Sequence, residues 1–280
     1  MATSNPILRA LGRIALAAVL LLLLFIAGVA GLGYTFWQQT APVRFDTAAA
    51  ARIATTDWTT LVPGPGMPSE APIQAANNNV DLVAFAGAYY LAFRTGPTHF
   101  ASPQTRMVML RSEDRETWTL ERIFVLPDSD LREPRFLVFQ DTLFFYFFRG
   151  GDNPMGFAPK YIFATARQPD GTWAEPREVY EPGYVVWRTR VHGEVAYMSV
   201  YDGAGLYTLA DRPGDVRLLR STDGFNWTAI SEAPQVVEVG AEEGEFIFAD
   251  NGDLYATVRL EVQGSMVCHA RADDLAQWDC

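Results

Sequence analysis

A turn followed by a tryptophan occurs four times in this chain at a nearly constant interval. The clearest copy is STDGFNW, residues 221–227, where an apolar run enters an Asp-Gly turn and a tryptophan begins the next run. Asp and Gly tolerate the positive backbone angles of a tight turn, so the segment predicts a β-hairpin. The other copies end at Trp118, Trp173 and Trp278, and the successive spacings are 55, 54 and 51 residues. We call these segments the Asp-turns, and a period of this length predicts a repeat architecture.

Each repeat contains four short runs of aromatic and β-branched residues that are separated by turns. In the first repeat these runs begin at Val80, Tyr89, Arg106 and Trp118. Four-stranded units at this period are typical of β-propeller blades. The sequence therefore predicts an all-β propeller of about four blades over residues 76–280. Because the fourth Asp-turn lies next to the last residue, we expect most of that blade's outer strand to be missing and a longer parent protein with one or two further blades.

An apolar stretch precedes the repeats. Residues 14–37 contain no charged side chain, and as a helix they would be about 36 Å long, enough to cross a bilayer. Arg9 and Arg13 precede the stretch, so the positive-inside rule places residues 1–13 in the cytoplasm and the propeller on the extracytoplasmic side, in the periplasm or outside the cell. A cleaved signal peptide is the alternative, and the length of the run favours a retained transmembrane anchor.

Residues 38–75 are rich in Ala, Thr, Pro and Gly, which predicts a tether. Within it, TDWTTLV at 56–62 resembles an Asp-turn tryptophan with its following strand. Propellers often close their ring with a strand from the far terminus, so we expect residues 58–62 to pair as that strand. At the other end, Cys268 and Cys280 flank the fourth Asp-turn, where facing hairpin positions would allow a disulfide in an oxidising compartment. The sequence leaves this pairing open.

Composition argues against several classes of partner. The net charge is −11 and no Lys/Arg cluster occurs, which argues against a nucleic-acid-binding surface. Three His and two Cys at these spacings predict no metal site, and neither a phosphate-binding loop nor an HExxH motif is present. We therefore predict no metal, no cofactor and no nucleic-acid partner.

Two sets of residues resemble known families. The Ser-x-Asp-Gly-x-x-Trp turns resemble the Asp-box repeats of the sialidase superfamily in a form one residue shorter, and RADDLAQW at 271–278 is similar to turns of five-bladed propeller glycosidases. The stretch EGEFIFADNGDLYATVR at 243–259 resembles the sialidase segment that runs from a catalytic Glu through an Asp-Gly turn to an Arg. The resemblance covers residues 76–280. It implies that Glu243 assists a Tyr nucleophile and that Arg259 binds a substrate carboxylate.

The chain departs from the sialidase pattern at other positions. The Arg-Ile-Pro motif expected at the first blade is replaced there by NNNVD at 77–81, and its nearest analogue is Arg132-Glu133-Pro134, one blade later. That triplet also resembles the Arg-Asp-Pro motif of five-bladed glycosidases, with Glu in place of Asp. By the family's pattern, a Tyr nucleophile and a third Arg would lie beyond Cys280, so neither is assigned. The resemblance therefore implies the fold more specifically than the activity.

Antiparallel strands decide which residues can meet. The Asp-turns join third to fourth strands, so they lie on the face opposite to the starts of the first strands and the ends of the second strands. On that opposite face we predict three candidate acid/base carboxyl groups, because glycosidases place carboxyl groups across the scissile bond. These catalytic candidates are Asp81, Glu133 and Glu243. The predicted substrate-binding residues on the same face are Arg94, Arg149, Arg259, His99 and Arg135.

Three of the predicted arginines end a second strand. Arg94, Arg149 and Arg259 would ring the central axis if they are equivalent, and guanidinium groups bind carboxylates in a bidentate manner. This arrangement predicts an acidic sugar as ligand. The alternative is that each Arg pairs with a neighbouring carboxylate and only ties blades together.

Two hypotheses for function follow from these residues. The first is an exported, membrane-anchored sialidase-like or related glycosidase propeller that hydrolyses or binds acidic glycans. The second is a non-catalytic propeller that binds a glycan or a protein. Since a fold does not by itself determine function, the geometry of the site has to distinguish them.

Overall fold

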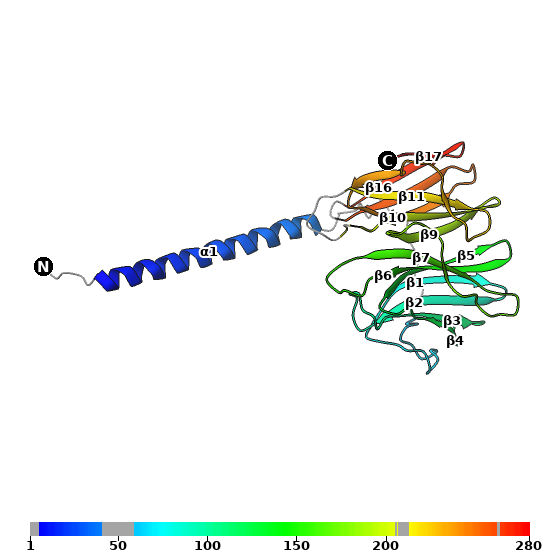
Figure 1. The fold of residues 1–280 in the computed structure, drawn as a ribbon, viewed down its shortest axis with the longest axis horizontal. Helices are drawn as coiled ribbons and strands as arrows, with labels where there is room; N and C mark the ends of the chain where they lie inside the picture. The colour runs from blue at the N-terminus through cyan, green and yellow to red at the C-terminus, as the bar shows by residue number, and fades with distance from the viewer. Residues whose placement is uncertain (1–5, 41–58, 205, 207–212, 262–263) are drawn as a thin grey trace, which may run out of the picture. The chain divides into compact units, whose positions relative to one another are not determined.

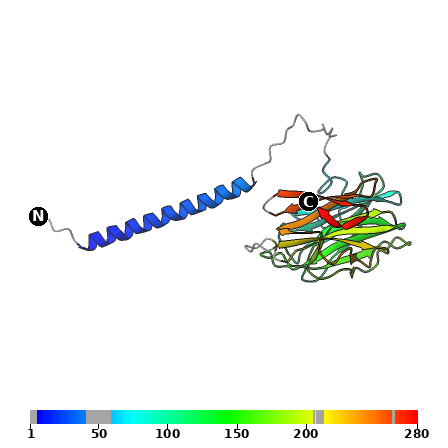
Figure 2. The ribbon, with the colours of Figure 1, turned by 90° about the horizontal axis from the view of Figure 1, so that it is seen from above.

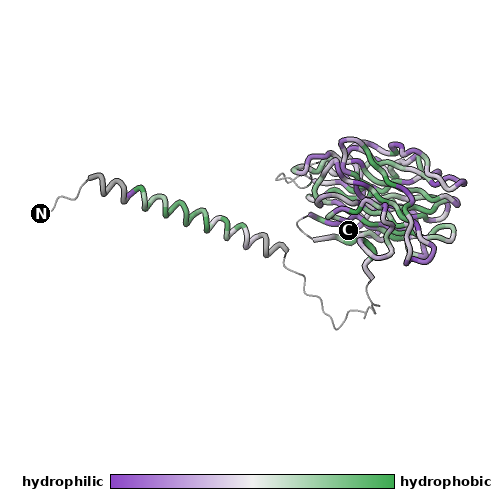
Figure 3. Tube along the Cα trace, turned by 90° about the horizontal axis from the view of Figure 1, so that it is seen from below, coloured by the Kyte–Doolittle hydropathy of each residue, from purple (hydrophilic) through white to green (hydrophobic). Residues whose placement is uncertain are grey.

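The computed structural model describes residues 6–40, 59–204, 206, 213–261 and 264–280. The chain divides into two compact units, Met1–Asp57 and Trp58–Cys280. The first contains one helix, α1 (Pro6–Thr40), and the apolar residues along it are visible in Figure 3. Its segment Arg13–Thr35 is long and apolar enough to cross a membrane, and a signal sequence has the same properties. The predicted anchor is therefore helical, while most of the predicted tether, residues 41–58, lies outside the described residues.

The second unit consists of four antiparallel sheets that we call blades 1 to 4 (Figures 1 and 2). Blade 1 contains β1 (Ala76–Phe85), β2 (Ala88–Gly96), β3 (Arg106–Ser112) and β4 (Thr119–Phe124). Blade 2 contains β5 (Asp130–Phe139), β6 (Thr142–Gly150), β7 (Pro159–Ala166) and β8 (Arg177–Glu178). Blade 3 contains β9 (Tyr184–His192), β10 (Val195–Asp202), β11 (Pro213–Ser221), β12 (Thr228–Ala229) and β13 (Val236–Val239), which also pairs with β11. Blade 4 contains β14 (Ala241–Phe248), β15 (Leu254–Leu260), β16 (Gly264–Arg271) and β17 (Asp274–Asp279).

Neighbouring blades pack face to face through apolar side chains. Between blades 1 and 2 the core is aromatic, with Phe124 stacked on Phe145 at 5.3 Å and Phe136 at 4.9 Å from Phe145, measured between ring centroids. Buried aromatic pairs of this kind add stability beyond the area that they bury. A second, larger cluster joins blades 2, 3 and 4. The predicted all-β propeller of four-stranded blades is confirmed.

The Asp-turns are third-to-fourth-strand hairpins, as the sequence predicts. In the blade 1 turn, Asp114 Oδ1 accepts hydrogen bonds from the amides of Glu116 and Thr117, both at 2.8 Å. These amide bonds lower the pKa of Asp114 to about 2. The tryptophans that follow the four turns are all buried: Trp118, Trp173, Trp227 and Trp278. Each Asp-turn therefore reverses the chain and fixes an apolar anchor in the core.

The Asp-turn of blade 3 also packs against blade 2. The Tyr146 hydroxyl of β6 donates a 2.7 Å hydrogen bond to the Gly224 carbonyl, and the Phe144 and Phe225 rings meet edge to face at 5.2 Å. Gly224 has φ +75°, and a Cβ placed there would lie 2.5 Å from the Phe144 ring. Only glycine combines that backbone angle with this close approach.

The segment before β1 differs from the prediction. Thr59–Val62 forms no strand, and Trp58 lies outside the described residues, so the expected ring-closing strand at 58–62 is not present in residues 59–62. Instead Leu61 and Val62 pack with other apolar side chains of residues 61–73 against an outer cluster of blade 1. The Trp118 amide donates a 3.0 Å hydrogen bond to the Gly66 carbonyl. The apolar residues of the segment 61–73 thus cover the outer cluster of blade 1 without adding a strand.

The outer strand of blade 4 also differs from the prediction. Its outer strand is present as β17, which begins at Asp274 and pairs with β16, so most of that strand is not missing. The fourth turn is tighter than the others, and Trp278 lies within the strand after it. Cys268 and Cys280 form a disulfide that links β16 to the last residue.

Candidate functional site

Every first strand has an irregularity at a similar level. In β1 the pairing with β2 skips Asn79, and in β9 the pairing with β10 skips Trp187. In β5 and β14 the corresponding shifts begin at Glu133 and Glu243. Glu133 and Glu243 begin shifts of the same kind, in which two residues of the first strand lie opposite one of the second, whereas Asn79 and Trp187 are single extra residues in β1 and β9. We call Asn79, Glu133, Trp187 and Glu243 the bulge site.

Three of the four bulge residues have a strained backbone. The φ angles are +47° at Asn79, +52° at Glu133 and +48° at Glu243, a region that residues with a Cβ rarely adopt. Each such residue costs about 1 kcal/mol or more unless the surroundings hold it in place. Bulges change the direction in which side chains point and often occur next to active sites, so this level of the propeller is the candidate active site.

Glu133 is held on both carboxyl oxygens. Arg135 Nη2 donates to Oε2 at 2.8 Å, and Asn79 Nδ2 donates to Oε1. Burial raises the pKa of Glu133, the negative charge of Glu243 raises it further, and Arg135 and Arg132 oppose the shift. Glu133 therefore retains a proton more readily than a free glutamate.

Glu243 has a different environment. Arg259 Nη1 lies 3.1 Å from Glu243 Oε1 and 2.8 Å from Oε1 of the fully buried Glu242. The Glu243 side chain is 23% exposed, whereas that of Glu133 is 9% exposed. The two equivalent carboxyl groups therefore differ in solvation and in counter-charge.

Arg135 positions its neighbours. Its guanidinium carbon lies 4.8 Å from the centre of the Trp187 ring, and Nε donates to the Trp187 carbonyl. Nη1 donates to the Pro134 carbonyl at 2.6 Å. Only 4% of Arg135 is exposed. The structure therefore makes Arg135, predicted as a substrate-binding residue, a group that orients Glu133 and links blade 2 to Trp187 of blade 3.

Asp81 lies two residues after the bulge in β1. Its Oδ2 accepts a 2.7 Å hydrogen bond from the Phe136 amide of blade 2, and Arg188 Nη1 lies 3.7 Å from Oδ1. Burial raises the pKa of Asp81, while the Phe136 hydrogen bond and the charges of Arg135 and Arg188 lower it. Because one oxygen already bonds a backbone amide, Asp81 connects blades at the edge of the bulge site.

The three strand-end arginines are not brought together. Arg94 is fully buried and pairs with Asp130 of blade 2 at 2.9 Å, while Arg259 contacts the two glutamates of its own blade. Arg149 Nε donates to Ser129 Oγ at 2.8 Å. In the ladders, Arg94 faces Asn78 and Arg259 faces Glu242, the residues just before two of the bulges, whereas Phe148 takes that place in blade 2. Arg149 is one register position away, so the assumed equivalence of the three is wrong.

His99 lies in the loop between β2 and β3 and is exposed. Its Nδ1 is 3.0 Å from Asn78 Nδ2. The partial loss of solvent around the ring and the positive charges of Arg132 and Arg94 lower the pKa of His99. The imidazole is therefore neutral over a wider pH range than a free histidine, and it contacts Asn78, the residue next to Asn79 of the bulge site.

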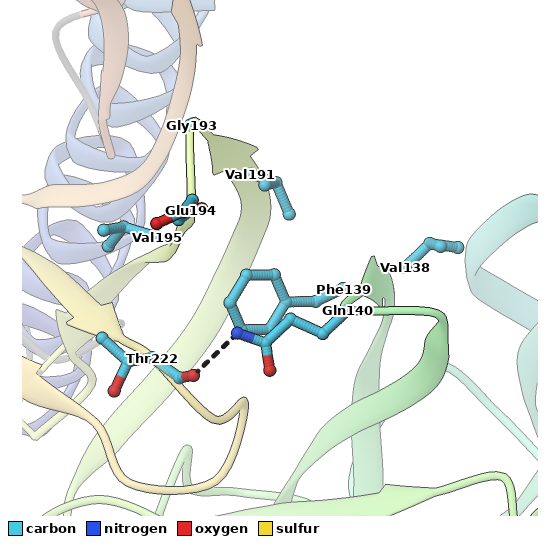
Figure 4. Close-up of a pocket in the computed structure, with 8 residues that line it drawn as sticks. All are labelled: Val138, Phe139, Gln140, Val191, Gly193, Glu194, Val195 and Thr222. Atoms are coloured by element: carbon cyan, nitrogen blue, oxygen red, sulfur yellow. Dashed lines mark hydrogen bonds between the residues drawn. The ribbon is translucent and has the colours of Figure 1, made fainter.

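The opposite ends of the first strands form a groove of about 560 Å³ between blades 2 and 3 (Figure 4). Val138 and Val191 line it, and Gln140 Nε2 donates a 3.1 Å hydrogen bond to the Thr222 carbonyl across it. Glu194 is the charged residue of its lining. None of the predicted site residues lies in this groove, so the face that holds the Asp-turns does not hold the candidate chemistry.

Known structures share this architecture. Trypanosoma rangeli sialidase in complex with sialic acid superimposes with a TM-score of 0.57 at 12% identity over 73% of this chain and 37% of the sialidase. An exo-1,5-α-L-arabinanase from a bovine ruminal metagenomic library gives 0.53 at 11% identity over 78% of this chain and 84% of the enzyme. A family 117 glycoside hydrolase from Zobellia galactanivorans gives 0.50 at 14% identity over 72% and 67%. The chain has the fold of the propeller glycosidases. It spans little more than a third of the sialidase's length, and at these identities the likeness establishes the fold alone.

No protein-family model and no curated protein matches the sequence. In this propeller-glycosidase fold, the predicted residues Glu133 and Glu243 both lie at register shifts of first strands, and the sequence prediction does not select Asn79 or Trp187. Aligning the repeats on their first strands, rather than on the Asp-turns, would have made Asn79 the equivalent of Glu133. Among the described residues, no group of three His, Cys, Asp or Glu side chains is arranged to hold a metal ion.

Proposed function

We propose that the propeller hydrolyses glycosides at the bulge site, with Glu133 as the general acid and Glu243 as the second carboxyl group. One observation carries this proposal. Two carboxyl groups occupy equivalent strained positions, and their environments differ: Glu133 is buried between Asn79 and Arg135, and Glu243 is partly exposed beside Arg259. A buried carboxyl group with a raised pKa, together with a more exposed carboxyl group beside an arginine, is the arrangement that acid/base chemistry needs.

The proposed chemistry uses Glu133 in its protonated form and Glu243 as a carboxylate. Protonated Glu133 donates its proton to the oxygen of the leaving group as the glycosidic bond breaks. Ionised Glu243 either removes a proton from the attacking water or attacks the anomeric carbon, in which case water later hydrolyses the glycosyl ester with Glu133 as the base. The configuration of the first sugar released, read by proton NMR, distinguishes these two routes.

The charges near the site favour a sugar without a carboxylate. Arg135 and Arg259 both contact a glutamate of the bulge site, and Arg188 Nε lies 2.5 Å from Glu245 Oε2. A substrate carboxylate would compete with these side chains for the guanidinium groups. We therefore expect neutral glycosides to be better substrates than sialosides, and an acidic sugar stays the alternative.

A release assay tests the proposal. The full chain is incubated with 4-methylumbelliferyl α-L-arabinofuranoside, β-D-xyloside, β-D-galactoside and α-N-acetylneuraminide, and the variants Glu133→Gln and Glu243→Gln are compared with wild type. We expect the best substrate to be cleaved 10²- to 10⁴-fold more slowly by Glu133→Gln, because general acid catalysis has about this magnitude. A leaving group of low pKa, such as 2,4-dinitrophenol, should restore much of that loss.

The matched control is Glu194→Gln, which makes the same chemical change in the groove at the other face. It should leave turnover unchanged. Equal turnover by wild type and Glu133→Gln on every substrate would remove Glu133 from the mechanism. Turnover that disappears in both Glu133→Gln and Glu194→Gln would indicate a folding defect, which circular dichroism would show.

A non-catalytic binding propeller is the second candidate. It is favoured by the arginines, since Arg94 pairs with Asp130 of the next blade and Arg188 and Arg190 both contact Glu245 of blade 4. Such pairs tie blades together without requiring a substrate. Saturable binding of the methyl glycosides by a wild-type chain that cleaves none of the four substrates would support this candidate.

We also propose that α1 anchors the protein and that the propeller lies on the extracytoplasmic side. The apolar segment Arg13–Thr35 and the Cys268–Cys280 disulfide support this placement, because disulfides persist in oxidising compartments. Membrane fractionation with protease added to intact and to opened cells tests it. Protection of the propeller that disappears only when the cytoplasm is opened would contradict the assigned side.

A further inference from the structure

The loop between β2 and β3 is held by two arginines that bind its backbone. Arg94 donates to the carbonyls of Thr98 and Phe100 at 3.1 and 2.9 Å. Arg132 of blade 2 donates to the His99 carbonyl at 2.6 Å. Three successive carbonyl groups therefore accept charge-assisted hydrogen bonds, which are about twice as strong as neutral ones.

A single buried carboxylate balances these two cations. Asp130 Oδ1 lies 2.9 Å from Arg94 Nε, and its Oδ2 lies 2.6 Å from Arg132 Nε. The side chains of Arg94 and Asp130 are 0% and 2% exposed. Burying such charges costs several kcal/mol of desolvation free energy per ion, which the attraction between the paired charges has to offset. A surface loop held in this way is therefore fixed by an unusually demanding arrangement.

The same segments connect the loop to the bulge site. Asn78 contacts the His99 ring, and the next residue, Asn79, donates to Glu133. Arg132 binds the His99 carbonyl, and the next residue is Glu133 itself. In both strands, the residue before the bulge holds the loop and the bulge residue contributes to the site. The loop is thereby fixed relative to Glu133.

The side chains of this rigid loop are exposed. Phe100 is 63% exposed, and among the described residues it belongs to no apolar cluster and contacts no other ring. A large aromatic side chain left in water on a backbone this well ordered is unusual for a scaffold loop. Binding residues are found on loops that a rigid scaffold positions, and a preorganised loop loses little entropy when a ligand binds.

The His99 ring has a defined tautomer. Asn78 Oδ1 accepts a long hydrogen bond from Arg94 Nη1 at 3.5 Å, so the amide nitrogen of Asn78 faces the ring and donates to Nδ1. A neutral imidazole that accepts at Nδ1 carries its proton on Nε2. Within the part of the chain that the structure describes, Nε2 has no hydrogen-bond partner. His99 therefore offers one donor beside the Phe100 ring.

We propose that the loop of residues 97–101 is the substrate-recognition loop of the bulge site. The Phe100 ring packs against the C–H face of a sugar ring, and His99 donates Nε2–H to a sugar hydroxyl group. An aromatic ring with an adjacent donor matches the amphipathic faces of a neutral sugar. This inference rests on the proposed glycosidase function for its location and adds the residues that select the ligand.

Steady-state kinetics of the full chain test the assignment. The 4-methylumbelliferyl glycoside that wild type cleaves fastest is used with Phe100→Ala, Phe100→Tyr and His99→Ala. We expect Phe100→Ala to raise KM about five- to tenfold with kcat within about twofold, because loss of one aromatic contact weakens binding by about that factor. Phe100→Tyr retains the ring and should stay close to wild type, and His99→Ala should raise KM about threefold.

The matched control is Met155→Ala, since Met155 is 91% exposed in the corresponding loop between β6 and β7 of blade 2. It should change neither KM nor kcat. If Phe100→Ala and Met155→Ala have the same KM as wild type while Glu133→Gln loses activity, the loop assignment is wrong and the proposed function stands.

If no glycoside is cleaved, saturation-transfer NMR with the four methyl glycosides decides instead. A signal present in wild type and Met155→Ala and lost in Phe100→Ala supports the loop as a sugar site although hydrolysis has failed. The absence of any signal from wild type, or an equal signal from Phe100→Ala, overturns the inference.

Discussion

The two ends of the blade strands differ in how they use unusual backbone. At the Asp-turn end, the positive φ angles lie at Arg115, Gly171 and Gly224 in the first three copies, two of them glycines that adopt the angle without strain, and the aspartates bond amides of their own turns. At the bulge end, positive φ angles lie at Asn79, Glu133 and Glu243, which have to be held there. Most Asp-turn angles are carried by glycine and stabilise the blades, whereas the bulge angles are carried by polar residues, two of which, Asn79 and Glu133, contact each other.

The two ends also differ in how closely the repeats agree. The Asp-turns place a tryptophan in the core of every blade. The bulge position keeps the backbone irregularity while its residue changes among Asn, Glu, Trp and Glu. Similarity between repeats marks the groups that build a blade, and the varied residues at the irregularities of the first strands are the candidates for its chemistry.

The largest effect that separates the two ends is expected from Gly224→Ala. A Cβ at this position would lie 2.5 Å from the Phe144 ring in a tightly packed contact between blades, and φ is +75°. We expect the free energy of unfolding to fall by about 3 kcal/mol, because the clash adds to the backbone strain. Urea unfolding followed by tryptophan fluorescence measures this change. Activity per folded molecule should be unchanged, since the Asp-turns lie away from the bulge site.

Gly87→Ala is the matched control for the backbone strain that a residue with a Cβ has at positive φ. Gly87 has φ +78°, and nothing lies within 4 Å of a Cβ there. Its cost should be about 1 kcal/mol, so the difference between the two variants isolates the contact with Phe144. Equal losses in the two variants would show that the blade 3 turn does not depend on its packing against blade 2.

The sequence predicts the fold well because the fold depends on local signals. Turn residues, the Trp118 to Trp278 spacing and aromatic strands determine blades without reference to distant residues. The segment 59–62 is mispredicted because a Trp-Thr-Thr run has the composition of a strand, whereas its apolar side chains find a partner on the outer face of blade 1. The outer strand of blade 4 is mispredicted because the repeat pattern makes Trp278 the first residue of that strand, while β17 begins at Asp274.

The site is predicted less completely because it depends on register. Side chains alternate along a strand, so a shift of one residue reverses the face on which a side chain lies. The sequence shows Arg94 and Arg149 at the ends of similar strands, yet their pairing partners differ by one position. The bulges cannot be recognised in the sequence either, because one extra residue in a strand does not change its composition noticeably. Glu133 and Glu243 are found from their resemblance to known motifs, and Asn79 and Trp187 need the ladders.

A smaller effect, confined to the bulge end, is expected from Asn79→Asp. The change is nearly isosteric, Asp tolerates the positive φ, and it places a third carboxyl group against Glu133 Oε1. Burial and the Glu243 charge already raise the pKa of Glu133, and activity requires its protonated form, so kcat/KM should fall as the pH rises through that pKa. A nearby negative charge favours protonation further, and the alkaline limb of the pH profile should move upward by about one pH unit. Gln140→Glu adds the same charge at the Asp-turn end, within the groove of Figure 4, and should leave that limb in place. An alkaline limb that moves equally in both variants, or in neither, would show that a group other than Glu133 supplies the proton.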